Sequence, residues 1–224
     1  MIIFYRRCVK IMSSAPTKLT ETPASQLVNG VARLWVDGVG AYLLCFDRQI
    51  QIGGAGGERE TQAEISLLSN LSRYHARLIR SGEIWLLEPL GPVTVEDRPV
   101  VRQCLLNDGN RILLGSSVKL RFRLPSALTG TARLDFESSH RTNPSVDGII
   151  LLAGTCVLGP GLDSHITCRP ECDRVLLTQR ASGFWCQANG GVWVDGVTFG
   201  TEAPCQAGRV YSGQNWRFRL ESCG

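Results

Sequence analysis

The sequence predicts an all-β protein built from two tandem antiparallel β-sandwiches. Helical periodicity is hard to find along the 224 residues, whereas short runs of alternating apolar and polar residues recur throughout. Asp-Gly, Ser-Gly and Asn-Asp-Gly sequences, which are typical of tight turns, separate these runs. Segments of one half of the chain also match segments of the other half in the same order, which indicates an internal duplication.

Residues 1–26 are expected to form a disordered leader. The opening, MIIFYRRCVKIM, is apolar only up to Arg6-Arg7, far short of the roughly 20 residues that span a bilayer, and no small-residue cleavage site follows it. The next segment is rich in Ser, Thr and Pro and lacks periodicity up to Gln26. We therefore predict neither a membrane span nor a secretory signal in this segment, and Met12 is an alternative start of translation.

Residues 27–125 form the first predicted sandwich. Segments 31–36 and 41–46 are expected to pair as a hairpin around Asp37-Gly38, and a second hairpin is expected around Ser81-Gly82. After the turn LNDGNR, the segment 118–124 alternates strictly, as a half-buried strand requires. One face of this strand carries Leu120, Phe122 and Leu124, and the other carries Lys119, Arg121 and Arg123.

The internal comparison predicts a second sandwich over residues 130–224. TARLDF at 131–136 echoes VARLWV at 31–36, and WRFRLES at 216–222 echoes LRFRLPS at 120–126. The repeated unit is about 100 residues long, which is an ordinary length for one domain. A short connector, Pro125–Thr129, would join the two units.

The composition is that of a packed globular protein without a nucleic-acid surface. Hydrophobic residues make up 43% and charged residues 20% of the chain, so it can bury a core. The net charge is +4, but the arginines are spread over many segments rather than clustered. We expect no nucleic-acid partner and no membrane partner.

The nine cysteines are expected to be buried free thiols, because their number is odd and they are scattered. A zinc site is the alternative, since His165, Cys168 and Cys172 lie close together and Cys186 is available on a neighbouring strand. A single short Cys-x3-Cys spacing without a clean second pair is weak support for such a site. No metal and no cofactor are therefore predicted.

Ser72 and His75, in the segment NLSRYHARLIR, invite a catalytic interpretation. A nucleophile and its base also need a group that orients the base and an oxyanion site, and neither has a sequence signature here. The Gly-x-Ser-x-Gly elbow is absent, and the glycine-rich segment GGAGGERE lacks the Gly-Lys-Ser/Thr of a nucleotide loop. We predict that the chain is not an enzyme. A purely structural turn with a half-buried histidine is the simplest alternative.

The segments LSRYHARL and LNDGNRILLG, which follow a strand that ends at Gly53, resemble the forkhead-associated (FHA) domain. That family's pattern is a strand ending in Gly-Arg, a Ser-x-x-His-Ala turn, an Asn-Gly turn, and a strand pair L-x-x-Gly-Asp-x-I-x-x-Gly. The resemblance extends over about Arg33–Leu124. FHA domains are β-sandwiches that bind phosphothreonine peptides through loops at one end, so the resemblance implies this fold and this function.

The resemblance also implies roles for individual residues. Ser72 would donate its hydroxyl to a phosphate oxygen, and Arg73 would supply positive charge. Gly54 occupies the position of the family's phosphate-clamping arginine, and Arg59 in the same loop is a possible substitute. Thr94, with Gly91, stands where the family has its Asn-Gly turn. The residues with expected structural roles are Gly53, His75, Gly91 and Gly115, of which His75 would tie the loops together.

The second unit departs further from the family pattern. Pro160 stands at the arginine position, and neither the serine nor the histidine of the motif is present, although Asn189-Gly190 falls near the place of the Asn-Gly turn. We therefore expect a degenerate FHA-like sandwich that is retained for packing.

These observations predict a cytoplasmic, non-enzymatic interaction protein of bacterial style that takes part in signalling. Its partner would be a protein or peptide that carries phosphothreonine. The alternative is a structural or scaffolding protein that binds an unphosphorylated partner, which the missing arginine and the missing Asn-Gly turn favour.

Overall fold

The computed structural model describes residues 30–56 and 62–223, and the predicted leader lies outside the described residues. The expected all-β sandwich class is confirmed, because the described residues form strands, turns and short bridges and no helix. None of them builds a helix long and apolar enough to cross a membrane.

Most strands of the first half correspond to the expected segments. They are β1 (Val31–Val36), β2 (Gly40–Cys45), β3 (Gln49–Gly54), β4 (Ile65–Leu67), β5 (Ala76–Ser81), β6 (Ile84–Pro89), β7 (Val93–Val95), β8 (Arg98–Pro99), β9 (Cys104–Leu106), β10 (Arg111–Leu114) and β11 (Val118–Arg123). Both predicted hairpins are confirmed, since β1 pairs with β2 and β5 pairs with β6. The alternation of β11 is also confirmed, because Leu120 and Phe122 are fully buried while Lys119 is exposed.

The second half contributes the remaining strands. They are β12 (Ala132–Phe136), β13 (Gly148–Leu151), β14 (Thr155–Gly159), β15 (Ile166–Thr167), β16 (Val175–Arg180), β17 (Gly183–Val194), β18 (Val197–Pro204), β19 (Val210–Ser212) and β20 (Arg217–Ser222). A five-stranded sheet has the order β4-β3-β5-β6-β9, and the other strands join one large sheet. Most pairs are antiparallel, whereas β3 with β4, β2 with β13, and β14 with β15 are parallel.

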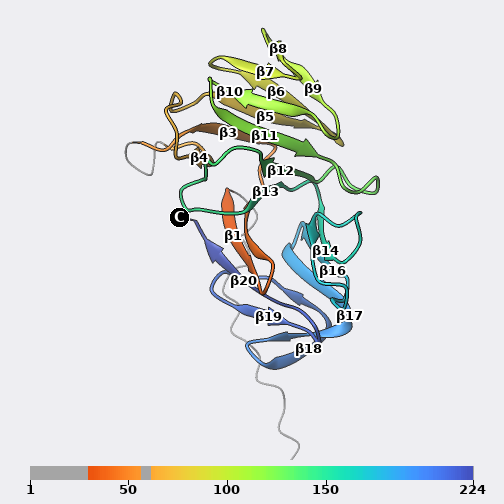
Figure 1. Ribbon diagram of the computed structural model, residues 1–224. Coiled ribbons are helices and arrows are strands. Elements are labelled where there is room, and N and C mark those ends of the chain that lie inside the picture. The colour runs from red at the N-terminus through yellow and green to blue at the C-terminus, as the bar shows by residue number, and fades with distance from the viewer. Residues whose placement is uncertain (1–29, 57–61, 224) are drawn as a thin grey trace, which may run out of the picture.

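The first core lies between the five-stranded sheet and one part of the large sheet, at the top of Figure 1. That part runs in the order β2-β13-β12-β11-β10-β7-β8. Its largest fully buried side chains include Trp85, Phe122, Ile50 and Leu78. The indole Nε1 of Trp85 donates a hydrogen bond to Gly130 O at 2.7 Å, which joins β6 to the segment before β12.

The second core lies among the remaining strands of the large sheet, at the bottom of Figure 1. Side chains of β1, β2, β13 and β20 face side chains of β14, β16 and β17 across it. Aromatic rings fill part of the space: Phe46 meets Phe184 edge to face at 5.2 Å, and Tyr211 stacks on Phe218 at 5.0 Å between ring centroids.

Strands β2 and β13 belong to both cores. Alternate residues of a strand point to opposite faces of the sheet. On β2, Leu43 therefore packs in the first core and Leu44 in the second, while on β13 Ile149 faces the first core and Ile150 the second. Because both faces are covered, these strands are continuous apolar runs, as buried parallel pairs usually are.

The two halves of the chain exchange their first strands. Strand β12, from the second half, pairs with β11, so that Leu134 lies opposite Phe122 in the first core. Strand β1, from the first half, pairs with β20, so that Leu34 lies opposite Leu220 in the second core. Each packed core therefore draws strands from both of the predicted ranges, 27–125 and 130–224.

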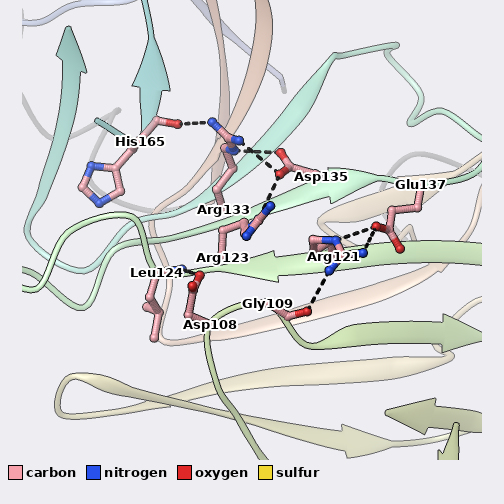
Figure 2. A network of polar contacts seen from close by, with 9 residues as sticks. All are labelled: Asp108, Gly109, Arg121, Arg123, Leu124, Arg133, Asp135, Glu137 and His165. Atoms are coloured by element: carbon pink, nitrogen blue, oxygen red, sulfur yellow. Dashed lines mark hydrogen bonds and ion pairs between the residues drawn. The ribbon is translucent and has the colours of Figure 1, made fainter. Parts of the chain in front are cut away.

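A network of ion pairs covers the outer face of β11 and β12 and reaches the second half (Figure 2). Arg133 pairs with Asp135, which Arg123 also approaches at 3.8 Å. The Arg133 guanidinium also donates through Nη1 to His165 O at 2.9 Å. Partly exposed ion pairs contribute little stability each, so their main effect here is to orient the chain segments.

Candidate functional site

The loop that contains Ser72 lies directly against the end of β3. Gly54 N donates to Ser72 O at 2.9 Å, and His75 N donates to Ile52 O at 2.8 Å. A Cβ atom at Gly53 would lie 1.7 Å from Arg73 O, a separation that no side chain can tolerate. The loop can take this path only because β3 ends in glycine.

Gly54 is required for the same reason. A Cβ atom at this position would lie 2.5 Å from Leu71 O and 3.2 Å from Ser69 O. The backbone of the Ser72 loop therefore fills the space into which a side chain at residue 54 would project. An arginine cannot be placed here without moving the loop.

His75 joins three chain segments from a buried position. Its side chain is only 4% exposed, and Nε2 lies 2.9 Å from Pro92 O. Because a carbonyl oxygen can only accept, Nε2 must be the protonated nitrogen. The backbone carbonyl of His75 accepts hydrogen bonds from Leu90 N at 3.0 Å and Gly91 N at 2.8 Å.

The remaining two glycines predicted to be structural also lie at this end of the sandwich. A Cβ at Gly91 would lie 2.6 Å from the His75 ring, so the loop after β6 can approach the histidine only as glycine. Gly115 has a positive φ of 60°, and its amide donates to Pro92 O at 2.9 Å. A Cβ there would lie 2.9 Å from Leu71 Cδ2.

This framework leaves Ser72 and Arg73 on the surface. Both side chains are exposed, whereas Leu71 before them is half-buried and packs against the first core. The loop thus presents a hydroxyl and a guanidinium to solvent on a backbone fixed by the hydrogen bonds of residues 54 and 75. Such a pair can donate charge-assisted hydrogen bonds to an anionic group.

The other predicted site residues lie elsewhere. Arg59 lies outside the described residues. Thr94 lies within strand β7, where its backbone is paired with Leu113 on one side and Pro99 on the other, so it is not part of the loop that contains Gly91. Arg102, a further basic residue of the first half, lines an open cavity of about 500 Å³ beside β7 and β8, and no residue of the 69–75 loop contributes to its walls.

A segment of the second half also lies at this end of the first sandwich. The connection between β12 and β13 runs alongside β4: Leu68 N donates to Arg141 O, and Asn143 N donates to Ser66 O, both at 2.8 Å. Leu67 and Thr142 form a β-bridge between these hydrogen bonds. Sequence reasoning missed this segment because nothing local links residues that are about 75 positions apart.

Among residues 30–56 and 62–223, the second core has no equivalent of the Ser72 loop. Pro160 directly follows β14, as expected, and Asn189-Gly190 lies inside the long strand β17, where the pairing register shifts, rather than in a loop. An open cavity of about 560 Å³ is lined by the turn after β1, the segment after β15 and the segment between β19 and β20, with Arg169, Trp216 and Arg217 among its residues.

The residues of the alternative zinc site make other contacts. Val157 N donates to Nδ1 of His165 at 3.0 Å, and Nε2 lies 3.1 Å from Thr131 O, so backbone groups occupy both ring nitrogens. The Cys172 thiol donates to Asp173 O at 3.2 Å. Within residues 30–56 and 62–223, no three His, Cys, Asp or Glu side chains are grouped as metal ligands.

Comparison with known proteins gives similarity to solved FHA domains. No family model and no curated protein match the chain. The Rv0020c FHA domain is 30% identical over 38% of this chain and 84% of its own length, with a TM-score of 0.27. The FhaA FHA domain, solved with the intracellular domain of Rv3910, is 29% identical over 38% of this chain and 91% of its own, with a TM-score of 0.28.

A third structure comes from a study of phosphothreonine-dependent FHA domain interactions. It is 28% identical over 38% of this chain and 88% of its own length, with a TM-score of 0.27. The chain spans most of each of these domains, and the identity reaches 30%. Over the share that is matched, the chain is similar to these solved FHA domains.

Proposed function

We propose that the chain is a non-enzymatic protein-interaction module whose first sandwich recognises a phosphothreonine peptide through the Ser72 loop. The observation that carries this proposal is the exposure of Ser72 and Arg73 on a loop that Gly53, Gly54 and His75 hold in one conformation. A fixed loop binds without the entropic cost of ordering it first.

The solved FHA domains to which the chain is similar support this proposal. One of them belongs to a study of phosphothreonine-dependent interactions, and another was solved with the intracellular domain of a partner protein. Ser72 lies in the motif that this chain shares with the family pattern, and its hydroxyl can donate to a phosphate oxygen. Arg73 adds a positive charge beside it, which favours a dianionic ligand.

The test compares matched peptides that differ only in phosphorylation of one threonine. We expect the full chain to bind phosphothreonine peptides from a degenerate library and to bind the unphosphorylated forms at least tenfold more weakly, since charged hydrogen bonds contribute about 1.5–3 kcal/mol. Ser72→Ala should remove most of the preference. Equal binding of both peptide forms, or an unchanged preference in Ser72→Ala, would refute the proposal.

A second candidate function is a scaffold that binds an unphosphorylated partner. The outer face of the five-stranded sheet favours it, because Ile84 and Leu105 are 48% and 46% exposed there, and β9 is paired on one side only. An exposed apolar edge is a ready surface for another chain. Leu105→Lys should abolish such binding and leave phosphopeptide binding unchanged, as titrations of one partner against both variants can show.

A further inference from the structure

The family pattern places a phosphate-clamping arginine where this chain has Gly54. If the first sandwich binds phosphate, that positive charge must come from another residue. An arginine at residue 54 is excluded by the close approach of Leu71 O and Ser69 O. Arg73 supplies one guanidinium at the loop, but a phosphate dianion is usually held by more than one charged donor. The relevant neighbours are therefore the basic residues on segments that pack beside β3 and β4.

The connection between β12 and β13 brings Arg141 to this place. Leu67 pairs with Gly54 on one side and with Thr142 on the other, so residues 54 and 142 lie two strand positions apart. Neighbouring strands are about 4.8 Å apart, which puts the two backbones roughly 10 Å from each other. Thr142 is 1% exposed, and its neighbour Arg141 is exposed, as alternation along an extended segment requires.

The guanidinium of Arg141 is available for a ligand. Nη1 donates to His140 O at 2.8 Å and Ser138 O at 3.3 Å, and the group lies over the Phe136 ring at 5.6 Å. Both hydrogen bonds use the same nitrogen, so Nε and Nη2 can still donate in the fork geometry that suits phosphate. Among the ion pairs of the described residues, none includes Arg141 or Arg73.

We infer that Arg141, contributed by the second half of the chain, completes the phosphate-binding end of the first sandwich together with Ser72 and Arg73. This inference rests on the proposed function, and it assigns the second half a part in recognition that a degenerate copy retained for packing would not have. The ligand is the phosphate group of a phosphothreonine peptide.

The test uses the full chain and a phosphothreonine peptide that binds the wild type, measured by fluorescence anisotropy. Arg141→Gln removes the charge but keeps a donor for the carbonyls of Ser138 and His140. Arg180→Ala is the matched control, because Arg180 also lies over an aromatic ring, Trp185 at 5.0 Å, but belongs to β16 of the second core.

We expect Arg141→Gln to weaken phosphopeptide binding about tenfold or more, to leave binding of the unphosphorylated peptide unchanged, and to flatten the dependence of affinity on salt. Arg141→Lys should recover part of the loss, and Arg180→Ala should bind within about twofold of the wild type. Thermal unfolding of each variant shows whether the fold is retained.

Two results separate the failure of this inference from the failure of the proposed function. If Ser72→Ala loses the phosphopeptide while a folded Arg141→Gln binds it as tightly as the wild type, the role of Arg141 is wrong and the function stands. If the wild type binds phosphorylated and unphosphorylated peptides equally, both proposals fail.

Discussion

Leu43 and Leu44 are consecutive residues of β2, and they are buried in two different cores. The strand that carries them is paired in parallel with β13, whose residues Ile149 and Ile150 divide between the cores in the same way. Loss of this pair of strands would open both cores at once. The chain should therefore unfold as a single cooperative unit.

A truncation at the sequence boundary tests this arrangement. The fragment 27–125 lacks β12 and β13, which cover the first core beside β11 and β2. It should therefore fail to fold, because Phe122 and Leu43 lose their neighbours and the edge of β11 is left unpaired. Amide chemical-shift dispersion and a cooperative thermal transition are the measurements.

A fragment that follows the packing is the control for this truncation. Residues 40–153 contain every strand of the first core, from β2 to β13, and omit β1, which belongs to the second core. This fragment should show more native-like dispersion than 27–125, although the face of β2 that carries Leu44 becomes exposed. A well-folded 27–125 fragment would contradict the exchange of first strands.

The stability of the chain should fall in mild acid because of His165. Burial of this side chain lowers its pKa from 6.5 to about 4, and the nearby Arg133 acts in the same direction. The folded state therefore holds His165 neutral, whereas the unfolded state takes up a proton near pH 6.5. The stabilisation is complete above that pH and is lost progressively as the pH falls toward 4.

From this shift we expect a loss of roughly 2 kcal/mol of unfolding free energy between about pH 7 and pH 5 from this residue alone. Urea denaturation of the wild type and of His165→Gln at both pH values separates the contribution of His165 from that of the carboxyl groups. The variant should be less stable at neutral pH and should lose less on acidification. An equal loss in both proteins would argue against a neutral, buried imidazole.

Restoring the family's arginine at residue 54 should damage the site. Gly54→Arg places a Cβ against Leu71 O, so the Ser72 loop must move, and we expect a loss of about 3 kcal/mol or more of unfolding free energy together with weaker phosphopeptide binding. Gly56→Arg is the control, because a Cβ there meets no atom within 4 Å. Tighter phosphopeptide binding by Gly54→Arg would show that the loop adapts readily.

Thiol reactivity should follow the burial of the cysteines. All eight cysteines in the described part of the chain are free. Burial raises the pKa of Cys45, Cys205 and Cys156, and that of Cys186 to about 12, so their reactive thiolates are scarce. Iodoacetamide at about pH 8 should modify the half-buried Cys104 before these four, and peptide mass mapping reports the order. Early modification of Cys45 would indicate that β2, the strand that carries it between the two cores, opens.

The strands could be predicted from the sequence because their signals are local. The alternation of Leu120 and Phe122 with charged residues depends only on the two-residue period of a strand. The turn at Asp37-Gly38 depends on the backbone freedom of glycine, which has a φ of 68° there. The pairing of β1 with β20 and of β12 with β11 could not be predicted, since VARLWV and TARLDF have similar apolar patterns and nothing local in either segment selects its neighbour.

The same distinction between local and non-local signals applies to the candidate site. Ser72, His75 and the glycines around them lie in a motif whose spacing is visible in the sequence, and the structure brings Gly53, Gly54, His75 and Gly91 together. The sequence predicts Thr94 in the loop, whereas the strand β7 begins one residue before it. Arg141 has no local signal, because its position depends on a pairing between the two halves of the chain.

The layer formed by β2 and β13 has a consequence for how this chain can evolve. After an ordinary duplication, one copy is free to decay or be deleted, because the other folds alone. Here deletion of either half of the chain would remove two strands from the core that remains, so each half is needed for the packing of the other. Surface positions of the second half can therefore vary freely, but its strands β12 and β13 cannot be dispensed with.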